Sequence, residues 1–256
     1  MTRTRLGVAA VAWLLLVVGA ACSDDDNPDL TLPGAASYPD DDADTTTAET
    51  SDPLLGEVFH VAQALDEQLV VRGAAQESAD EVVTLEAADQ VSGKVVCLVV
   101  QQVGEWVEVR LPTGPRRSGW VARDDVALSR HRFRIEVSRS EHLLTLYTGE
   151  IVTLEAPVAL GPDTPETGER LFVTALVQPP AGARPYAAYA YGLSGADNDV
   201  DAFRAGEGVV AVHGVTDDAT LGSDVPAGAI GVADDVVTRM ADAIGLPLGT
   251  PVDIVE

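Results

Sequence analysis

The segment 213–232, HGVTDDATLGSDVPAGAIGV, begins with a histidine that follows an apolar run, and its glycines recur where a chain would turn tightly. Such a histidine can serve as the general base of a covalent reaction if a nucleophile lies within hydrogen-bond reach. Residues 226–229 supply only Pro-Ala-Gly-Ala. The pattern is that of a catalytic segment without its reactive side chains, which raises the question whether it was ever catalytic.

Other nucleophilic side chains are few. Ser223, Thr216 and Thr220 carry hydroxyls in the same segment, but a hydroxyl needs far more activation than a thiol. Cys97 stands within the apolar run VVCLVV, which predicts a buried and unreactive thiol. We therefore expect no nucleophile from these residues.

The histidines are not spaced as metal ligands. His60, His131 and His142 show no zinc pattern with one another. The acids that follow His213 could hold a cation with it, but in a chain with 41 acidic residues they are more simply a solvated loop: Asp217, Asp218 and Asp224. We expect neither a metal nor another cofactor. For His213 itself, a structural histidine satisfied by the backbone is preferred over a residual base.

Short strands and one helix must position this segment. Residues 131–256 contain apolar runs such as RFRIEVS, HLLTLYT and RLFVTALVQ, separated by turn residues. Residues 233–245 have a helical pattern, with Val236, Val237, Met240 and Ile244 on one face and Gly245 where a helix would stop. This half is predicted to be a mostly β domain with one helix.

Residues 57–130 are also rich in short strands. The runs KVVCLVVQQ, EWVEVRLP and RSGWVARDDVALS resemble the end of bacterial SH3-like barrels, which commonly accompany wall-active domains. Trp106 and Trp120 fall at strand spacing, which predicts core positions rather than a binding groove. The predicted architecture is an SH3-like small barrel followed by the second β domain.

The second half resembles the catalytic domain of the L,D-transpeptidases, the peptidoglycan cross-linking enzymes of the bacterial envelope. The resemblance runs from residue 132 to 256 and rests on the tracts APVALGPDTPETGERLFVTAL, YAAYAYGLSG, VVAVHG and PLGTPVDIV. Thr164, Pro165 and Gly168 resemble the family's T-P-x-G turn, with two residues instead of one between Pro165 and Gly168. The resemblance implies an L,D-transpeptidase-type β-sandwich and a role at peptidoglycan stem peptides.

In that family a cysteine within S-H-G-C-x-R attacks a peptide carbonyl, and a histidine from an upstream H-G-T acts as its base. His213 and Gly214 take the H-G positions, with Val215 in place of the Thr. The signature is then occupied, in order, by Pro226, Ala227, Gly228, Ala229, Ile230 and Gly231. Ala229 thus stands at the nucleophile and Gly231 at the Arg, so the resemblance implies a degenerate site with no intact catalytic residue.

The first 22 residues are typical of an export signal, with Arg3 and Arg5 before an apolar stretch. Its end, Gly-Ala-Ala before Cys22, resembles a bacterial lipoprotein signal, which implies lipidation of Cys22 and a membrane anchor outside the cytoplasmic membrane. The alternative is an ordinary cleaved signal with an incidental cysteine. Residues 23–56 are acidic and rich in Pro, Thr and Asp, which predicts a disordered tether.

A formal net charge of −25 argues against nucleic-acid binding, because no basic surface is available for phosphates. The main hypothesis is a non-catalytic envelope lipoprotein that binds peptidoglycan stems or an active transpeptidase partner. One alternative is a still-active transpeptidase-family enzyme or hydrolase that uses Ser223 or a metal held by His213. Another is a structural spacer, with function residing in the SH3-like module.

Overall fold

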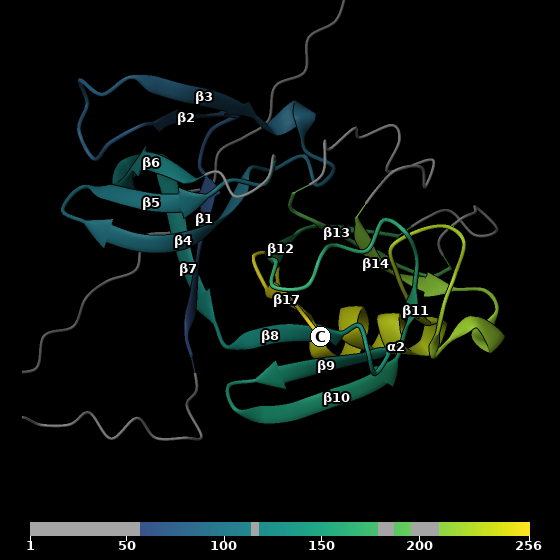
Figure 1. Ribbon diagram of the computed structural model, residues 1–256. Coiled ribbons are helices and arrows are strands. Elements are labelled where there is room, and N and C mark those ends of the chain that lie inside the picture. Colours follow the sequence, from purple (N-terminus) through teal and green to yellow (C-terminus); the bar gives the residue numbers. More distant parts are fainter. Residues whose placement is uncertain (1–56, 114–117, 179–186, 196–209) are drawn as a thin grey trace, which may run out of the picture. The chain divides into compact units, whose positions relative to one another are not determined.

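The computed structural model describes residues 57–113, 118–178, 187–195 and 210–256 (Figure 1). These residues belong to one compact unit, Ala48–Glu256. The predicted signal, Cys22 and most of the predicted tether lie outside the described residues. No helix in the described ranges is long and apolar enough to cross a membrane.

Within the described residues, the first seven strands form one antiparallel sheet in the order β3-β2-β6-β5-β4-β1-β7. The strands are β1 (Phe59–Ala64), β2 (Gln68–Arg72), β3 (Glu81–Glu86), β4 (Val96–Val103), β5 (Trp106–Arg110), β6 (Ser118–Ala122) and β7 (Val126–His131). Two short 3₁₀ helices interrupt them, Ala87–Asp89 and Arg123–Asp125. Aliphatic side chains from one face of the strands build its hydrophobic core, which includes Cys97.

Side-chain alternation along β5 and β6 decides where the tryptophans lie. Val107, Val109 and Val121 are fully buried in the core, so their neighbours on the strands face the opposite side. Trp106 and Trp120 are therefore half-buried on the outer face. The expectation that they are core residues is wrong, because alternation gives the inner face to the smaller valines.

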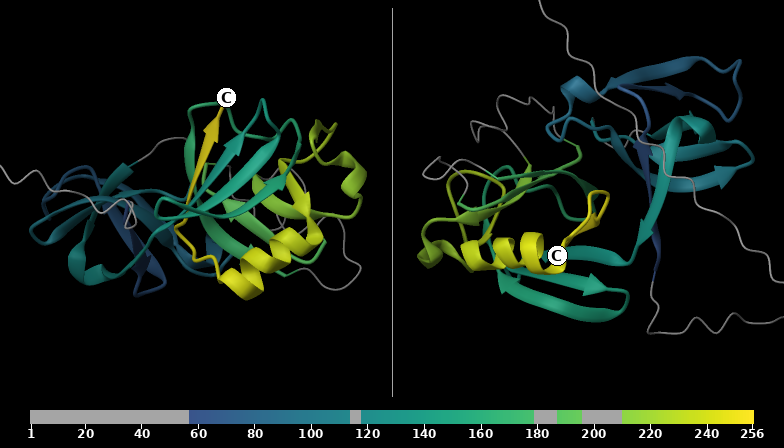
Figure 2. Two further views of the ribbon diagram at one scale, coloured as in Figure 1. Left: turned by 90° about the horizontal axis from the view of Figure 1, so that it is seen from below. Right: turned by 180° about the vertical axis from the view of Figure 1, so that it is seen from behind.

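A second sheet follows in the order β10-β9-β8-β17-β12-β13-β14-β16-β11-β15 within the described residues. Its strands are β8 (Phe133–Ser138), β9 (Leu143–Thr148), β10 (Ile151–Pro157), β11 (Ala159–Leu160), β12 (Arg170–Val177), β13 (Ala190–Leu193), β14 (Ala211–Val215), β15 (Ser223–Asp224), β16 (Ile230–Ala233) and β17 (Pro251–Val255). The final strand β17, yellow at the C-terminus in Figure 2, lies between β8, with which it pairs in parallel, and β12, with which it pairs antiparallel. Residues from both halves of this sheet meet in one hydrophobic core, which makes it a sandwich.

One helix packs against this sheet. The α-helix α2 (Asp234–Thr238) continues as a π-helix over Arg239–Ile244, and α2 contacts β14 and β16. Val237 and Met240 are fully buried in the core. Gly245 ends the helix in the left-handed conformation, with φ of 67°, as a C-terminal glycine does. Within the described residues, the prediction of a mostly β second half with one helix is confirmed.

Candidate functional site

The site begins where two parallel strands, β14 and β16, lie side by side. Their register places His213 opposite Gly231 and Val212 opposite Ile230. The loop 226–229 leads directly into β16, which begins at residue 230. Its last residue therefore enters the sheet beside the part of β14 that contains His213. The structure therefore brings His213 and the loop together, although more than ten residues separate them in the sequence.

His213 is tied to the backbone of its own strand. Its Nδ1 lies 3.1 Å from the carbonyl oxygen of Gly214, and a carbonyl only accepts, so Nδ1 carries the hydrogen. Burial lowers the pKa of His213 below its usual value, against a smaller raising effect of that hydrogen bond. The imidazole is therefore neutral at pH 7. This hydrogen bond is the kind expected of a histidine that is satisfied by the backbone.

A cavity of about 210 Å³ lies beside the imidazole. Small apolar residues make up most of its lining, together with four polar ones: Ala159, His213, Val215, Thr216, Asp217, Thr220, Val225, Ala227, Ala229 and Gly231. Ala229 is only 2% exposed, so it forms part of the cavity floor rather than the outer surface. The volume is below the range of about 300–1,000 Å³ usual for drug-sized ligands. It suits a group the size of one amino-acid residue.

The loop that holds Ala229 is fastened by the preceding turn. The carbonyl oxygen of Ala229 accepts hydrogen bonds from Gly161 N at 2.7 Å and from Thr164 Oγ1 at 3.0 Å. Asp163 N donates to the carbonyl oxygen of Gly228 at 3.1 Å. A side chain at residue 161 is impossible here, because a Cβ would lie 2.0 Å from the Gly228 oxygen. These contacts give Thr164, in the predicted T-P-x-G turn, a structural function.

Gly228 has a conformational requirement of its own. Its φ is +86°, in the left-handed region that favours glycine. A Cβ at this position would lie 3.5 Å from Nε2 of His213. The ring edge of His213 therefore faces the loop at the residue before Ala229, which places the histidine and the alanine on the same small cavity.

The side chain of Val215 occupies the space that a side chain at residue 231 would need. A Cβ on Gly231 would lie only 2.5 Å from Cγ1 of Val215, so the two strands leave no room for a side chain at 231. Both residues differ from those the resemblance implies, Thr and Arg. The structure thus places the two substitutions in contact, a pairing that sequence order alone does not reveal.

Of the remaining candidate nucleophiles, Ser223 and Cys97 lie outside the cavity. Ser223 is exposed on β15, donates to the carbonyl oxygen of Thr220 at 2.7 Å, and does not line the cavity. Thr216 and Thr220 do line it. Cys97 is fully buried in the first sheet, and burial raises the pKa of its thiol to about 12, as expected of an inert cysteine.

Acidic residues near His213 are distributed along the loop. Asp217 caps the short 3₁₀ helix Asp218–Thr220 by accepting from Ala219 N at 3.0 Å. Asp224 lies on β15, where its Oδ1 is 3.1 Å from Nε2 of His142. Within the described ranges, no group of three or more His, Cys, Asp or Glu side chains lies close enough together to hold a metal ion.

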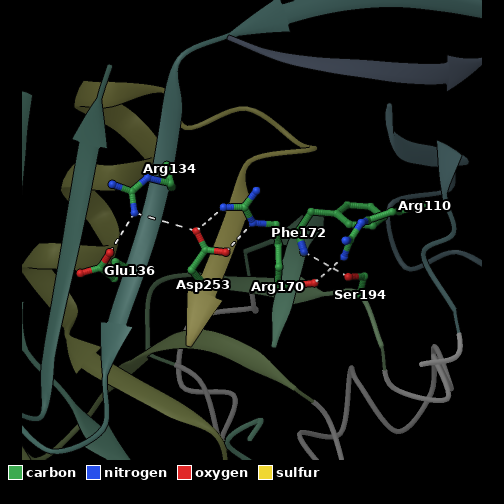
Figure 3. Close-up of polar contacts among 7 residues, drawn as sticks. All are labelled: Arg110, Arg134, Glu136, Arg170, Phe172, Ser194 and Asp253. Carbon is green, nitrogen blue, oxygen red and sulfur yellow. Dashed lines mark hydrogen bonds and ion pairs between the residues drawn. The ribbon is translucent and has the colours of Figure 1, made fainter. Parts of the chain in front are cut away.

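Three charged residues with long-range partners could not be singled out from the sequence, and one of them, Arg139, supports the turn. Arg139 Nη1 donates to the carbonyl oxygens of Thr164 and Pro165, at 3.2 and 2.8 Å. Beyond the turn, Arg170 forms a bidentate pair with Asp253 across β12 and β17, at 2.5 and 2.9 Å (Figure 3). Charge alone does not mark these residues, because their partners lie up to 83 positions away.

Comparisons with known proteins give only distant matches. No family model matches the chain, and no curated protein matches it. Solved L,D-transpeptidases are found by structural similarity. One from Mycobacterium smegmatis is 14% identical, with 77% of this chain and 99% of that chain covered and a TM-score of 0.41. One from Mycobacterium tuberculosis is 14% identical, with 77% and 98% covered and a TM-score of 0.42.

A third, from Xylanimonas cellulosilytica, is 14% identical, with 48% of this chain covered and a TM-score of 0.37. This chain spans about 60% of the length of that structure.

Proposed function

We propose that this protein is a non-catalytic, lipid-anchored envelope protein of the L,D-transpeptidase type that binds peptidoglycan stem peptides. The observation that carries the proposal is the cavity shared by His213 and Ala229. The histidine position and the turn around it persist, but the residue in the nucleophile position is an alanine with no reactive atom. Deleting the nucleophile of a covalent enzyme costs about a million-fold in rate.

Binding can persist where catalysis has been lost. The cavity keeps apolar walls of alanine, valine and glycine and a polar side formed by Thr216, Asp217 and Thr220. A methyl-bearing residue such as the terminal alanine of a stem peptide matches this volume of about 210 Å³ and this mixture of surfaces. The small size favours capture of one residue at the end of a short peptide.

The first test is chemical. The full chain is incubated with muropeptides that carry tetrapeptide stems, and the products are read by mass spectrometry. We expect no release of D-alanine by the parent chain. Release would contradict the proposal and direct attention to Ser223 or to a metal, and loss of that release with Ser223→Ala or with a chelator would distinguish the two. Cys97→Ser serves as the control for a stray thiol.

A cysteine at residue 229 tests whether the cavity can still bind a stem peptide in a reactive position. Ala229→Cys and the double variant Ala227→His, Ala229→Cys are assayed beside the parent. Activity that appears only with cysteine would show that stem peptides still enter the cavity. Because Gly231 and Val215 leave no room for the signature's arginine, we expect any restored rate to stay low.

The binding claim has its own test. Retention of the full chain on isolated wall sacculi is compared with retention on sacculi whose stem peptides have been removed by an amidase. We expect retention that depends on the stems and that falls with Ala229→Leu, because leucine fills the cavity. Ala127→Leu, an exposed position on β7, is the matched control. Equal retention on both kinds of sacculi would contradict stem binding and favour a spacer function.

A further inference from the structure

The outer face of the first sheet carries a groove that the proposed function does not use. It has a volume of about 520 Å³ and is lined by Val70, Arg72, Glu77, Glu105, Trp106, Ala122, Arg123, Asp124 and Asp125. These residues come from β2, β5, β6, the turns beside them and the 3₁₀ helix Arg123–Asp125. The groove is therefore formed by the first sheet alone.

Two tryptophans lie on this face. Trp106 is paired with Ala122 across β5 and β6, and both line the groove. Trp120 is two residues before Ala122, so it projects from the same face, and it is paired with Arg72 on one side and Glu108 on the other. Both indoles are half-buried and neither belongs to the core of the sheet. Trp106 supplies the apolar plate of the groove, and Trp120 lies on the same face outside the groove lining.

Hydrogen-bonding groups surround the plate. The groove holds four carboxylates and two guanidinium groups, a formal charge of 2 − 4 = −2. In the described part of the chain, no ion pair joins these carboxylates to an arginine, so their oxygens are available to a ligand. Arg72 and Arg123 each use one Nη1 to donate to a backbone carbonyl, of Ala79 and Val126. This leaves further N–H donors on each guanidinium.

We propose that this groove binds a neutral carbohydrate chain. A pyranose ring has an apolar C–H face that packs on an indole and a rim of hydroxyl groups that hydrogen-bond to carboxylates and guanidiniums. The net negative charge of the groove opposes an anionic polymer, and the unpaired charges oppose an apolar protein surface. The inference does not depend on the proposed function, because it concerns a different sheet.

Tryptophan fluorescence reports this site directly. The chain has three tryptophans, and Trp13→Phe leaves only Trp106 and Trp120. The full chain with this substitution is titrated with the β-1,4-linked tetramer of N-acetylglucosamine, with cellotetraose as a second probe, and affinity is confirmed by calorimetry. We expect saturable quenching or a blue shift of the emission, with a dissociation constant little changed between low and high salt.

Substitutions of Trp106 distinguish loss of the aromatic contact with the sugar from loss of the fold. Trp106→Ala should weaken binding about tenfold or more, whereas Trp106→Phe, which keeps an aromatic plate, should lose less. Ile151→Ala, an exposed aliphatic on β10, is the matched control and should bind like the parent. Circular dichroism checks that each variant is folded.

Three results would overturn the inference. The first is that tryptophan fluorescence shows no saturable change with either sugar up to about 10 mM. The second is that folded Trp106→Ala binds sugar with unchanged affinity. The third is that a trilysine peptide binds whereas sugar does not. Salt-sensitive trilysine binding would show that the groove is a site for basic peptides.

Discussion

Ala229, Gly231 and Val215 are small or compact residues that line one cavity with His213, and Val215 lies directly against Gly231. Their side chains determine both the absence of a nucleophile and the shape of the cavity. A valine that occupies the space above Gly231 also makes this position intolerant of any larger residue. Packing therefore links these positions, and a larger side chain at residue 231 requires a change at Val215.

A substitution at Gly231 tests this coupling. We expect Gly231→Ala to reduce the free energy of unfolding by about 1–3 kcal/mol, because the new Cβ overlaps Cγ1 of a stiff, β-branched valine. Urea unfolding followed by circular dichroism measures the change. The cost should be smaller when Val215→Ala is already present.

Gly73→Ala is the matched control for Gly231→Ala. Its Cβ would meet only ordinary van der Waals contacts, the nearest at 3.7 Å. We expect this control to change stability by less than about 0.5 kcal/mol. An equal cost for Gly231→Ala in the presence and absence of Val215→Ala would show that Val215 is not the obstacle.

At the scale of elements, the turn 161–164 holds the loop 226–229 in place through buried hydrogen bonds. Thr164 is 6% exposed, and its hydroxyl reaches the carbonyl of Ala229, 65 positions later. Arg139 in turn binds the carbonyl of Thr164. The turn therefore acts as a structural support, or brace, for the loop that lines the cavity. This function of the threonine does not require a nucleophile at residue 229.

Thr164→Val tests the brace. The isosteric side chain removes the hydroxyl donor, while Gly161 N still donates to the Ala229 carbonyl, so we expect a loss of about 1 kcal/mol in unfolding free energy. Thr84→Val is the control, because its hydroxyl bonds Glu81 at the surface and should contribute less. Indistinguishable costs for the two variants would mean that the buried bond adds no stability. Hydrogen exchange at the amides of residues 226–231 should rise only in Thr164→Val.

At the scale of the whole molecule, each sheet contains a partly buried imidazole whose pKa is lowered. His131 at the end of β7 lies between the rings of Phe59 and Phe133, each with a centroid distance of 6.1 Å, and burial lowers its pKa. The pKa of His213 in β14 is lowered for the same reason. Both rings are neutral in the folded chain at pH 7, and both would have to be charged in acid.

Stability should therefore fall in mild acid. As the pH falls through 6.5, the ordinary pKa of histidine, the unfolded chain binds protons at these rings before the folded chain does. Protons then favour the unfolded state, and stability is lost progressively below pH 6.5. Unfolding by urea at a series of pH values, with the parent beside His131→Gln and His213→Gln, measures this. A variant that carries both substitutions is measured as well. If the stability of the parent falls with decreasing pH no more steeply than the stability of this double variant, the assignment to these two histidines is contradicted.

Much of the fold follows from local pattern. The periodicity of residues 233–245 and the glycine at 245 predicted a helix that the structure contains, with its second half as a π-helix. The apolar surroundings of Cys97 predicted its burial correctly. Alternation in EWVEVRLP located a strand, but the face that each residue takes was misjudged for Trp106. Aromatic size suggested the core, whereas the paired valines of β5 and β6 occupy it.

The sequence by itself determined the mostly β class, the position of the helix and the absence of a nucleophile from 226–229, because these depend on residue type and on near-neighbour spacing. Only the tertiary structure decided that Val215 meets Gly231, that Thr164 supports Ala229, and that both tryptophans share an outer face with a charged groove. Each of these depends on strand register, which joins residues far apart in the chain. Register is set by the packing of the whole sheet, so no local stretch of sequence contains it.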